Sequence, residues 1–193
     1  TATFIDRDGW ARGPWDDEPD RVEWRSHGLP CLALRHPRGG HWCGYVGVPD
    51  GHPWFGWDYW DYSDAYAGYD DEGRPISPPA PAFTAFYDLA HCGLTFSNPC
   101  VESPDEPRER LVCHVPRGGE TDHVFWFGFD CAHAWDRRPG MEARDRERAE
   151  EYRTKGDFDT ARIWDHVEAD AVYRTLAYVR DVVRAMAEAA AQA

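Results

Sequence analysis

The run from His123 to Asp136, HVFWFGFDCAHAWD, constrains the fold of this chain more than any other stretch. Its first part is almost continuously apolar and aromatic, which is typical of a β-strand buried on both faces. Asp130, His133 and Asp136 follow as soon as the apolar run ends. Carboxylates and an imidazole at the end of a rigid element indicate a candidate functional site, so we expect the chemistry of this protein there.

Composition narrows the class of protein. With 193 residues, 42% of them hydrophobic, the chain is long enough to bury one core, and we expect a single domain over residues 1–193. It contains no basic, apolar leader and no apolar run long enough to cross a bilayer, so we expect a cytoplasmic protein without a membrane partner. The six cysteines form no CxxC pair, and in that compartment they would stay reduced. A net charge of −14 argues against long nucleic acid as a partner but leaves room for a small phosphorylated ligand.

Alternating and apolar segments separated by glycine and proline predict an antiparallel sheet. The expected strands are 31–35, 41–48, 93–97, 109–115 and 123–130. Residues 1–29 show no period and are expected to form an irregular N-terminal arm.

Helical periodicity is strongest at the C-terminus, where we expect a helix over 165–190. Its apolar stripe is Val172, Leu176, Val179, Val183 and Met186. We favour packing of this stripe on the sheet; a dimer seam is the alternative, and a homodimer stays open. Residues 141–153 predict a charged, solvated helix. The expected fold is therefore α+β: one domain with a mostly antiparallel sheet and a C-terminal helix packed on one face.

The segment HCGLTFS, from His91 to Ser97, suggests one wall of a ligand site. On a strand of period two, His91, Thr95 and Ser97 share one face, and Gly93 between them would let a ligand approach the backbone. The alternative is an ordinary solvated face, to which the same residue types are equally suited.

Aromatic and acidic residues interleave over residues 51–71. Trp54 and Tyr59 could stack a sugar or base as ligand-binding residues. We favour the alternative that these aromatics cover an edge of the core while the carboxylates keep the loop solvated.

The candidate catalytic residues are His91, Asp130, His133 and Asp136. Asp130, His133 and Asp136 could bind a divalent metal such as Zn, Mn or Mg, or non-haem iron. Without a metal, His133 would act as a general base oriented by either aspartate. A third reading is structural, with Asp130 capping a turn. A cysteine nucleophile is disfavoured, because adjacent strand residues point to opposite faces and Cys92 would not reach His91.

Four motifs together resemble an uncharacterised family of small bacteriophage and prophage proteins, chiefly from actinobacterial phages. They are GYVGVP-x-x-HP from Gly44 to Pro53, H-x-GLTF from His91 to Phe96, WFGFDCAH from Trp126 to His133, and LAYV from Leu176 to Val179. The usual second residue of the HGGLT motif is glycine, and here it is Cys92. The resemblance implies a phage accessory gene acting in the host bacterial cytoplasm and brings no established chemistry.

These observations lead to a hydrolase of a small phosphorylated or nucleotide-type ligand as the first hypothesis. Thr95 and Ser97 would position the ligand, and Arg35 or Arg117 would offset phosphate charge. The second hypothesis is a phage protein that sequesters a host nucleotide immune signal without chemistry, with aromatic residues of the 54–69 loop stacking the base. A carbohydrate binder or glycosidase is a third, motivated by ten tryptophans and the acidic loop.

Overall fold

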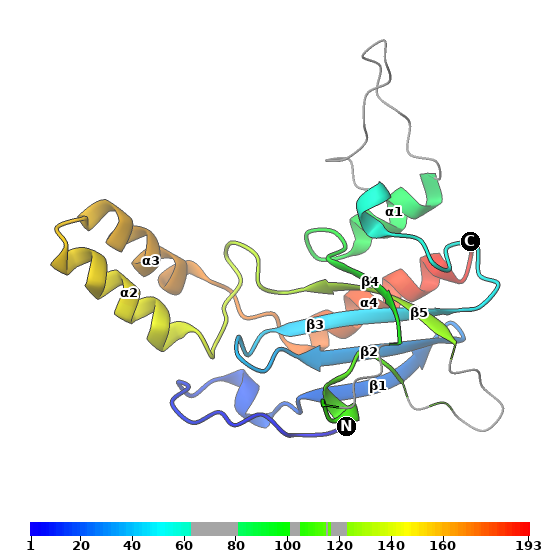
Figure 1. The fold of residues 1–193 in the computed structure, drawn as a ribbon, viewed down its shortest axis with the longest axis horizontal. Helices are drawn as coiled ribbons and strands as arrows, with labels where there is room; N and C mark the ends of the chain where they lie inside the picture. The colour runs from blue at the N-terminus through cyan, green and yellow to red at the C-terminus, as the bar shows by residue number, and fades with distance from the viewer. Residues whose placement is uncertain (63–80, 101–104, 115, 117–122) are drawn as a thin grey trace, which may run out of the picture.

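The computed structural model describes residues 1–62, 81–100, 105–114, 116 and 123–193. Its centre is a five-stranded antiparallel sheet with the strand order β1-β2-β3-β5-β4 (Figure 1). The strands are β1 Arg21–Ser26, β2 Leu29–Arg35, β3 Trp42–Pro49, β4 Phe96–Pro99 and β5 Val124–Asp130. The α+β fold predicted from the sequence is confirmed.

Strand β5 is buried on both faces, as its apolar run predicts. Phe125, Phe127 and Phe129 point into the larger core, whereas Val124 and Trp126 point into a second core on the other face. This alternation follows from the period of two along a strand. Asp130 ends this strand, paired with Cys43 of β3.

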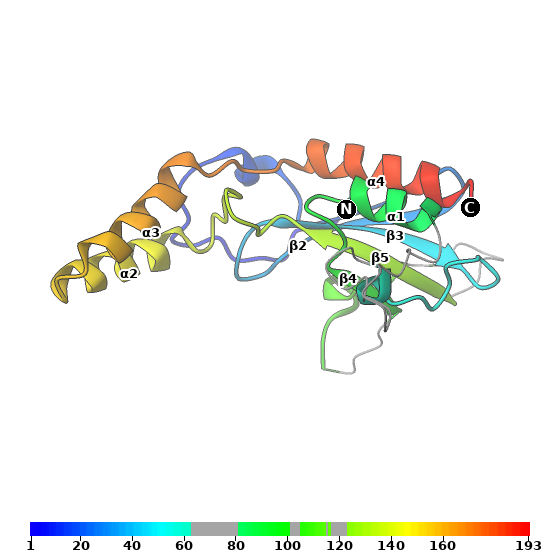
Figure 2. The same ribbon diagram turned by 90° about the horizontal axis from the view of Figure 1, so that it is seen from above.

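Two helices cover the face of the larger core (Figure 2). They are α1 Pro81–Leu89 and α4 Leu176–Ala190. Val179, Val183 and Met186 of α4 are fully buried in that core. The apolar stripe of the C-terminal helix thus packs on the sheet, which was the favoured reading over a dimer seam.

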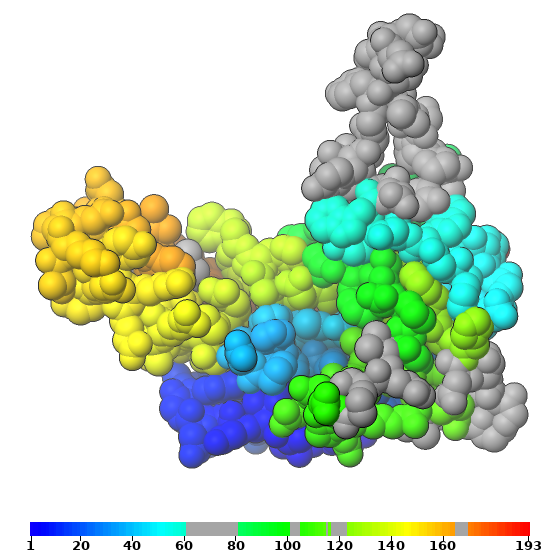
Figure 3. All heavy atoms as spheres, viewed as in Figure 1, coloured from blue at the N-terminus to red at the C-terminus, as the bar shows by residue number. Residues whose placement is uncertain are grey.

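The other helices lie outside the sheet. Helices α2 Glu142–Thr154 and α3 Phe158–Asp170 form a hairpin that projects from one end of the molecule (Figures 1 and 3). Short 3-10 helices occur at η1 Pro14–Asp17, η2 Tyr59–Tyr62 and η3 Arg108–Arg110. The charged helix predicted over 141–153 corresponds to α2. No helix in the described part of the chain has the length and apolar character needed to cross a membrane.

The irregular arm predicted over residues 1–29 is correct only in part, because Arg21–Ser26 forms β1. This segment is RVEWRS, whose polar residues hide the strand pattern; it becomes a strand by pairing with β2, with Val22 opposite Ala33. The C-terminal helix predicted over 165–190 is two helices, α3 and α4, with a non-helical link between them. Val172 lies in this link and is half exposed.

The strand predicted over 109–115 does not form in the described residues 109–114, which contain the end of η3 and irregular backbone. The Arg21 guanidinium takes the alternate backbone carbonyls of this segment instead. It donates hydrogen bonds to the carbonyls of Glu109, Leu111 and Cys113. In a β-sheet, a neighbouring strand would donate its backbone N–H groups to these same carbonyl oxygens. The buried Arg21 side chain therefore takes the place of the interstrand hydrogen bonds.

The cysteines depart from the expectation of six reduced thiols, since Cys100 and Cys113 form a disulfide. Cys31, Cys43, Cys92 and Cys131 are free thiols.

Candidate functional site

His91 lies in a tight turn after α1 and not on a strand, as the sequence pattern predicted. The turn needs left-handed backbone at Cys92 (φ 58°) and Gly93 (φ 91°). A Cβ at Gly93 would meet the Tyr87 ring at 2.6 Å, so glycine is required there for space as well as conformation. The turn directs His91 toward α4, where it meets Tyr178.

Both ring nitrogens of His91 are engaged. Its Nε2 donates to Asp136 Oδ2 over 2.7 Å, and its Nδ1 lies 2.8 Å from the Tyr178 hydroxyl. A carboxylate only accepts, so Nε2 carries a proton and donates it to Asp136, while the Tyr178 hydroxyl is the hydrogen-bond partner of Nδ1. His91 is thereby held in one orientation.

Asp136 is the centre of the cluster, and its side chain is only 1% exposed. Besides His91 it accepts hydrogen bonds from the His133 backbone N–H at 3.1 Å and from Arg174 Nε at 2.9 Å. An isolated parallel bridge between Asp136 and Val172 brings Arg174 to this position. Three donors from three parts of the chain therefore stabilise the buried carboxylate.

His133 and Asp130 form the more accessible side of the cluster. Their side chains are 29% and 31% exposed, and His133 Nε2 lies 3.9 Å from Asp130 Oδ1. Asp130 is held by the Ala132 backbone N–H at 2.9 Å, whereas His133 Nε2 has no hydrogen-bond partner among the described residues. The ring centroids of His133 and His91 are 5.6 Å apart. The four predicted catalytic residues are thus gathered in one place.

Two further histidines lie beside this cluster, on the turn between β2 and β3. The rings of His36 and His41 stack with centroids 4.7 Å apart. Burial lowers the pKa of His41 to about 4; His36 and Arg138 act in the same direction, while Asp130 and Asp136 oppose it. Burial also lowers the pKa of His36. Both imidazoles are therefore neutral at pH 7.

The predicted metal ligands do not form a three-ligand group. The structure describes one set of three ligand atoms close enough to share an ion, and it is Cys100, Cys113 and His114. Asp130, His133 and Asp136 are not such a set among the described residues. Asp136 also already accepts three hydrogen bonds. The geometry of this cluster favours the metal-free acid–base interpretation.

Arg35 cannot hold a ligand phosphate. Its side chain is fully buried, and its five N–H groups are taken by Asp20, Glu18, Tyr173 and the carbonyls of Pro19 and Gly40. Glu18 in turn accepts from the Leu176 backbone N–H. Arg35 therefore joins the N-terminal arm, the sheet and the start of α4, and the prediction of a ligand-binding role is wrong. Arg117 lies outside the described residues.

Trp54 is also a core residue, since it is 3% exposed and packs against Phe83 and Phe86. The favoured reading of the aromatic loop holds for this residue. Tyr59 is half buried, and its backbone N–H donates to Ser97 Oγ at 3.2 Å. The Ser97 hydroxyl also donates to Asp58, so it points to the loop before η2. Neither Ser97 nor Thr95 hydrogen-bonds to the described residues of the His91 cluster.

Cys92 corrects one argument from the sequence. Because the segment is a turn, its Sγ lies 3.9 Å from His91 Nε2, a contact that strand geometry would forbid. Burial and the Asp136 charge raise the pKa of this thiol, so it is protonated at pH 7. Burial likewise raises the pKa of Cys31 and of Cys43 to about 12. None of these three thiols has the thiolate character of a nucleophile.

Tyr178 and Arg174 were missed by the sequence reasoning. Tyr178 lies within the LAYV motif, which entered only as part of the family resemblance, and Arg174 lies in the link before α4. Arg174 precedes Thr175, the N-cap of α4, so helical spacing could not have paired it with Tyr178. No protein-family model matches this chain, and neither does any curated protein or solved structure.

Proposed function

We propose that the protein is a small hydrolase acting on a phosphorylated, nucleotide-type ligand at the cluster of His91, Asp130, His133, Asp136 and Arg174. The observation that carries this proposal is the free Nε2 of His133. It is a buried ring nitrogen without a hydrogen-bond partner among the described residues, beside Asp130 and within a side chain that is 29% exposed as a whole. A general base requires a ring nitrogen that is not already committed to a hydrogen bond within the protein.

The cluster divides into a positioning part and a reactive part. His91 and Asp136 are nearly buried and satisfied by their neighbours, so they fix the geometry. The Asp136 carboxylate holds the backbone of His133 and thereby orients the candidate base. His133 would remove a proton from water, and the water oxygen would attack phosphorus as the bond to the leaving oxygen breaks. The proton would then pass to that leaving oxygen.

Arg174 supplies the charge that a phosphate needs. Its Nε is bound to Asp136, and Tyr178 lies under its guanidinium at 5.2 Å. Its terminal nitrogens donate no hydrogen bond to a described residue, and its side chain is 29% exposed. A guanidinium fixed at one end and open at the other is suited to a phosphoryl oxygen. It replaces Arg35 as the candidate phosphate-binding residue.

Sequestration of a nucleotide signal is the second candidate function. It is favoured by the fact that the hydrogen-bonding groups of His91 and Asp136 are already paired within the protein. Such pairing makes a binding site rigid and does not require a chemical step. The resemblance to bacteriophage proteins suits either function, as an accessory role against the host.

Incubation of the protein with a panel of nucleotides and cyclic nucleotide signals, followed by chromatography before and after heating, tests the proposal. Conversion of one compound to a new peak supports hydrolysis, and we expect His133→Gln to lower that rate at least about 100-fold. His123→Gln is the matched control, since this exposed histidine lies at the opposite end of β5 and should leave the rate unchanged. A compound that disappears and returns intact on heating would instead establish sequestration. No change in any peak would contradict both functions.

A further inference from the structure

A second group of reactive side chains lies on the other face of the sheet. Cys100 follows β4, and Cys113 and His114 follow η3. One ligand atom from each residue lies within 4.8 Å of the other two. Cys113 and His114 are buried, while Cys100 is half buried against the smaller core that contains Trp126. This group is separate from the His91 cluster, which lies by α4.

Hydrogen bonds hold the Cys100 sulfur and the backbone carbonyls of Cys113 and His114. Trp126 Nε1 donates to Cys100 Sγ at 3.3 Å. Arg21 donates to the carbonyl of Cys113, and Arg108 to that of His114 at 3.0 Å. Figure 3 shows the green segment around η3 lying against the blue N-terminal region that supplies Arg21. Groups that orient ligands in this way are typical of metal sites, where an N–H donor also stabilises a thiolate.

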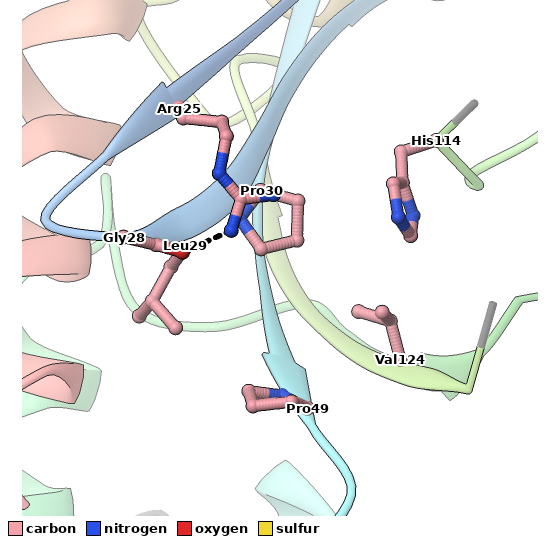
Figure 4. A pocket seen from close by; sticks show the side chains of 7 residues that line it. All are labelled: Arg25, Gly28, Leu29, Pro30, Pro49, His114 and Val124. Atoms are coloured by element: carbon pink, nitrogen blue, oxygen red, sulfur yellow. Dashed lines mark hydrogen bonds between the residues drawn. The ribbon is translucent and has the colours of Figure 1, made fainter. Parts of the chain in front are cut away.

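A pocket reaches one member of the group, His114. A cavity of about 190 Å³ is lined by His114 and Arg25 together with Gly28 and the apolar residues Leu29, Pro30, Pro49 and Val124. Figure 4 shows the His114 imidazole directed toward this cavity, with Val124 and Pro30 beside it. An ion or a water molecule can therefore reach the imidazole from solvent, and an entry path is one requirement of a metal site.

We propose that Cys100, Cys113 and His114 form a redox-controlled zinc site in which the disulfide is the oxidised, metal-free state. A dithiol or glutathione reductant would deliver two electrons and two protons, which breaks the S–S bond and gives two thiols while the reductant becomes a disulfide. Zn²⁺ would then bind both sulfurs and the imidazole and release the two thiol protons.

The donor set selects the metal class. Two thiolates and one imidazole suit a borderline-soft ion such as Zn²⁺ and disfavour Mg²⁺ or Ca²⁺, which prefer oxygen. Three protein ligands leave a fourth tetrahedral position for water. The alternative is that the Cys100–Cys113 disulfide is a permanent structural crosslink and the site never binds a metal.

Titration of the reduced protein with Co²⁺, a spectroscopic substitute for Zn²⁺, tests the proposal. With a phosphine reductant, we expect one Co²⁺ per chain, a sulfur-to-cobalt charge-transfer band in the near ultraviolet, and loss of that band when Zn²⁺ is added. The oxidised protein should show no band. Failure of the reduced wild-type protein to give the band would overturn the proposal without any need for variants.

Variants locate the site. Cys100→Ser should abolish the band, and His114→Gln should weaken cobalt binding at least about tenfold, since even loss of a supporting partner costs that much. Cys92→Ser is the matched control, because this exposed thiol lies beside the other cluster and should leave the titration unchanged. Equal loss of the band in Cys92→Ser and Cys100→Ser would overturn the assignment. Circular dichroism of each reduced variant verifies that it is folded.

Discussion

At the scale of single residues, the strongest electrostatic constraint is the buried pairing of Arg35 with Asp20 and Glu18. Arg35 and Asp20 are both fully buried, with Arg35 Nε 3.1 Å from Asp20 Oδ1. Burial opposes the charge of Glu18, but its hydrogen bonds from Tyr173, Leu176, Trp42 and Arg35 outweigh this and lower its pKa. The network is stabilising only while every member is paired.

Arg35→Ala should therefore destabilise the protein by about 3–5 kcal/mol, because it removes a fully buried guanidinium from Glu18 and Asp20, of which Asp20 keeps its ion pair with Arg7. Urea denaturation followed by tryptophan fluorescence measures this change. Arg12→Ala is the control, since Arg12 is 94% exposed in its ion pair with Asp16 and should change the free energy of unfolding by less than about 1 kcal/mol. Equal effects of the two variants would contradict the role assigned to Arg35.

The buried His41 predicts a pH dependence of stability. Its pKa is about 4 in the folded protein against an ordinary value of 6.5, so the unfolded chain binds the proton more readily between these two values. His41 should leave the free energy of unfolding unchanged above pH 6.5. As the pH drops toward 4, its contribution should lower the free energy of unfolding by about 3 kcal/mol.

Denaturation at pH 7 and pH 4.5 tests this dependence in the wild type and in His41→Asn. The variant lacks the titrating ring, so its loss of stability on acidification should be smaller, while carboxylates contribute equally to both proteins. The same loss in both would show that His41 does not titrate as described.

At the scale of elements, the position of α4 on the sheet depends on the missing side chain of Gly44. A Cβ there would lie 2.6 Å from Phe129 Cζ and 2.8 Å from Val183 Cγ2. Gly44→Ala should cost about 1–3 kcal/mol by overpacking this contact. Val183→Ala also destabilises, but it removes one of the two obstructing groups. The double variant should therefore be more stable than the sum of the two single effects predicts, which a double-mutant cycle measures. If the effects of the two single variants simply add, Val183 does not pack against Gly44 and the described position of α4 on the sheet is wrong.

Elements whose pattern is local were predictable, and those that depend on distant partners were not. β5 follows from its continuous apolar run, and the buried stripe of α4 follows from apolar periodicity. β1 could not be found, because its strand character comes from pairing with β2. The strand expected over 109–115 was wrong because Arg21, about ninety residues earlier, takes its carbonyls. A single long-range side chain can override a convincing local pattern.

At the scale of the whole molecule, the sheet separates two groups of reactive side chains. The face covered by α1 and α4 carries the His91 cluster near its rim, and the opposite face carries Cys100, Cys113 and His114. The residues of the first cluster were predictable because Asp130, His133 and Asp136 follow β5 directly. Arg174 and Tyr178 were not, since only the bridge between Asp136 and Val172 and the docking of α4 bring them there.

The most direct test of the His91 cluster as the ligand site is an amide NMR titration of the ¹⁵N-labelled protein with inorganic pyrophosphate. Binding at Arg174 and His133 predicts the largest shifts at residues 91–93, 130–136 and 174, with residues around Arg35 unchanged. Arg174→Gln should remove these shifts, whereas Arg184→Gln, an exposed arginine farther along α4, should retain them. Shifts centred elsewhere, or none, would contradict the assignment of the functional site.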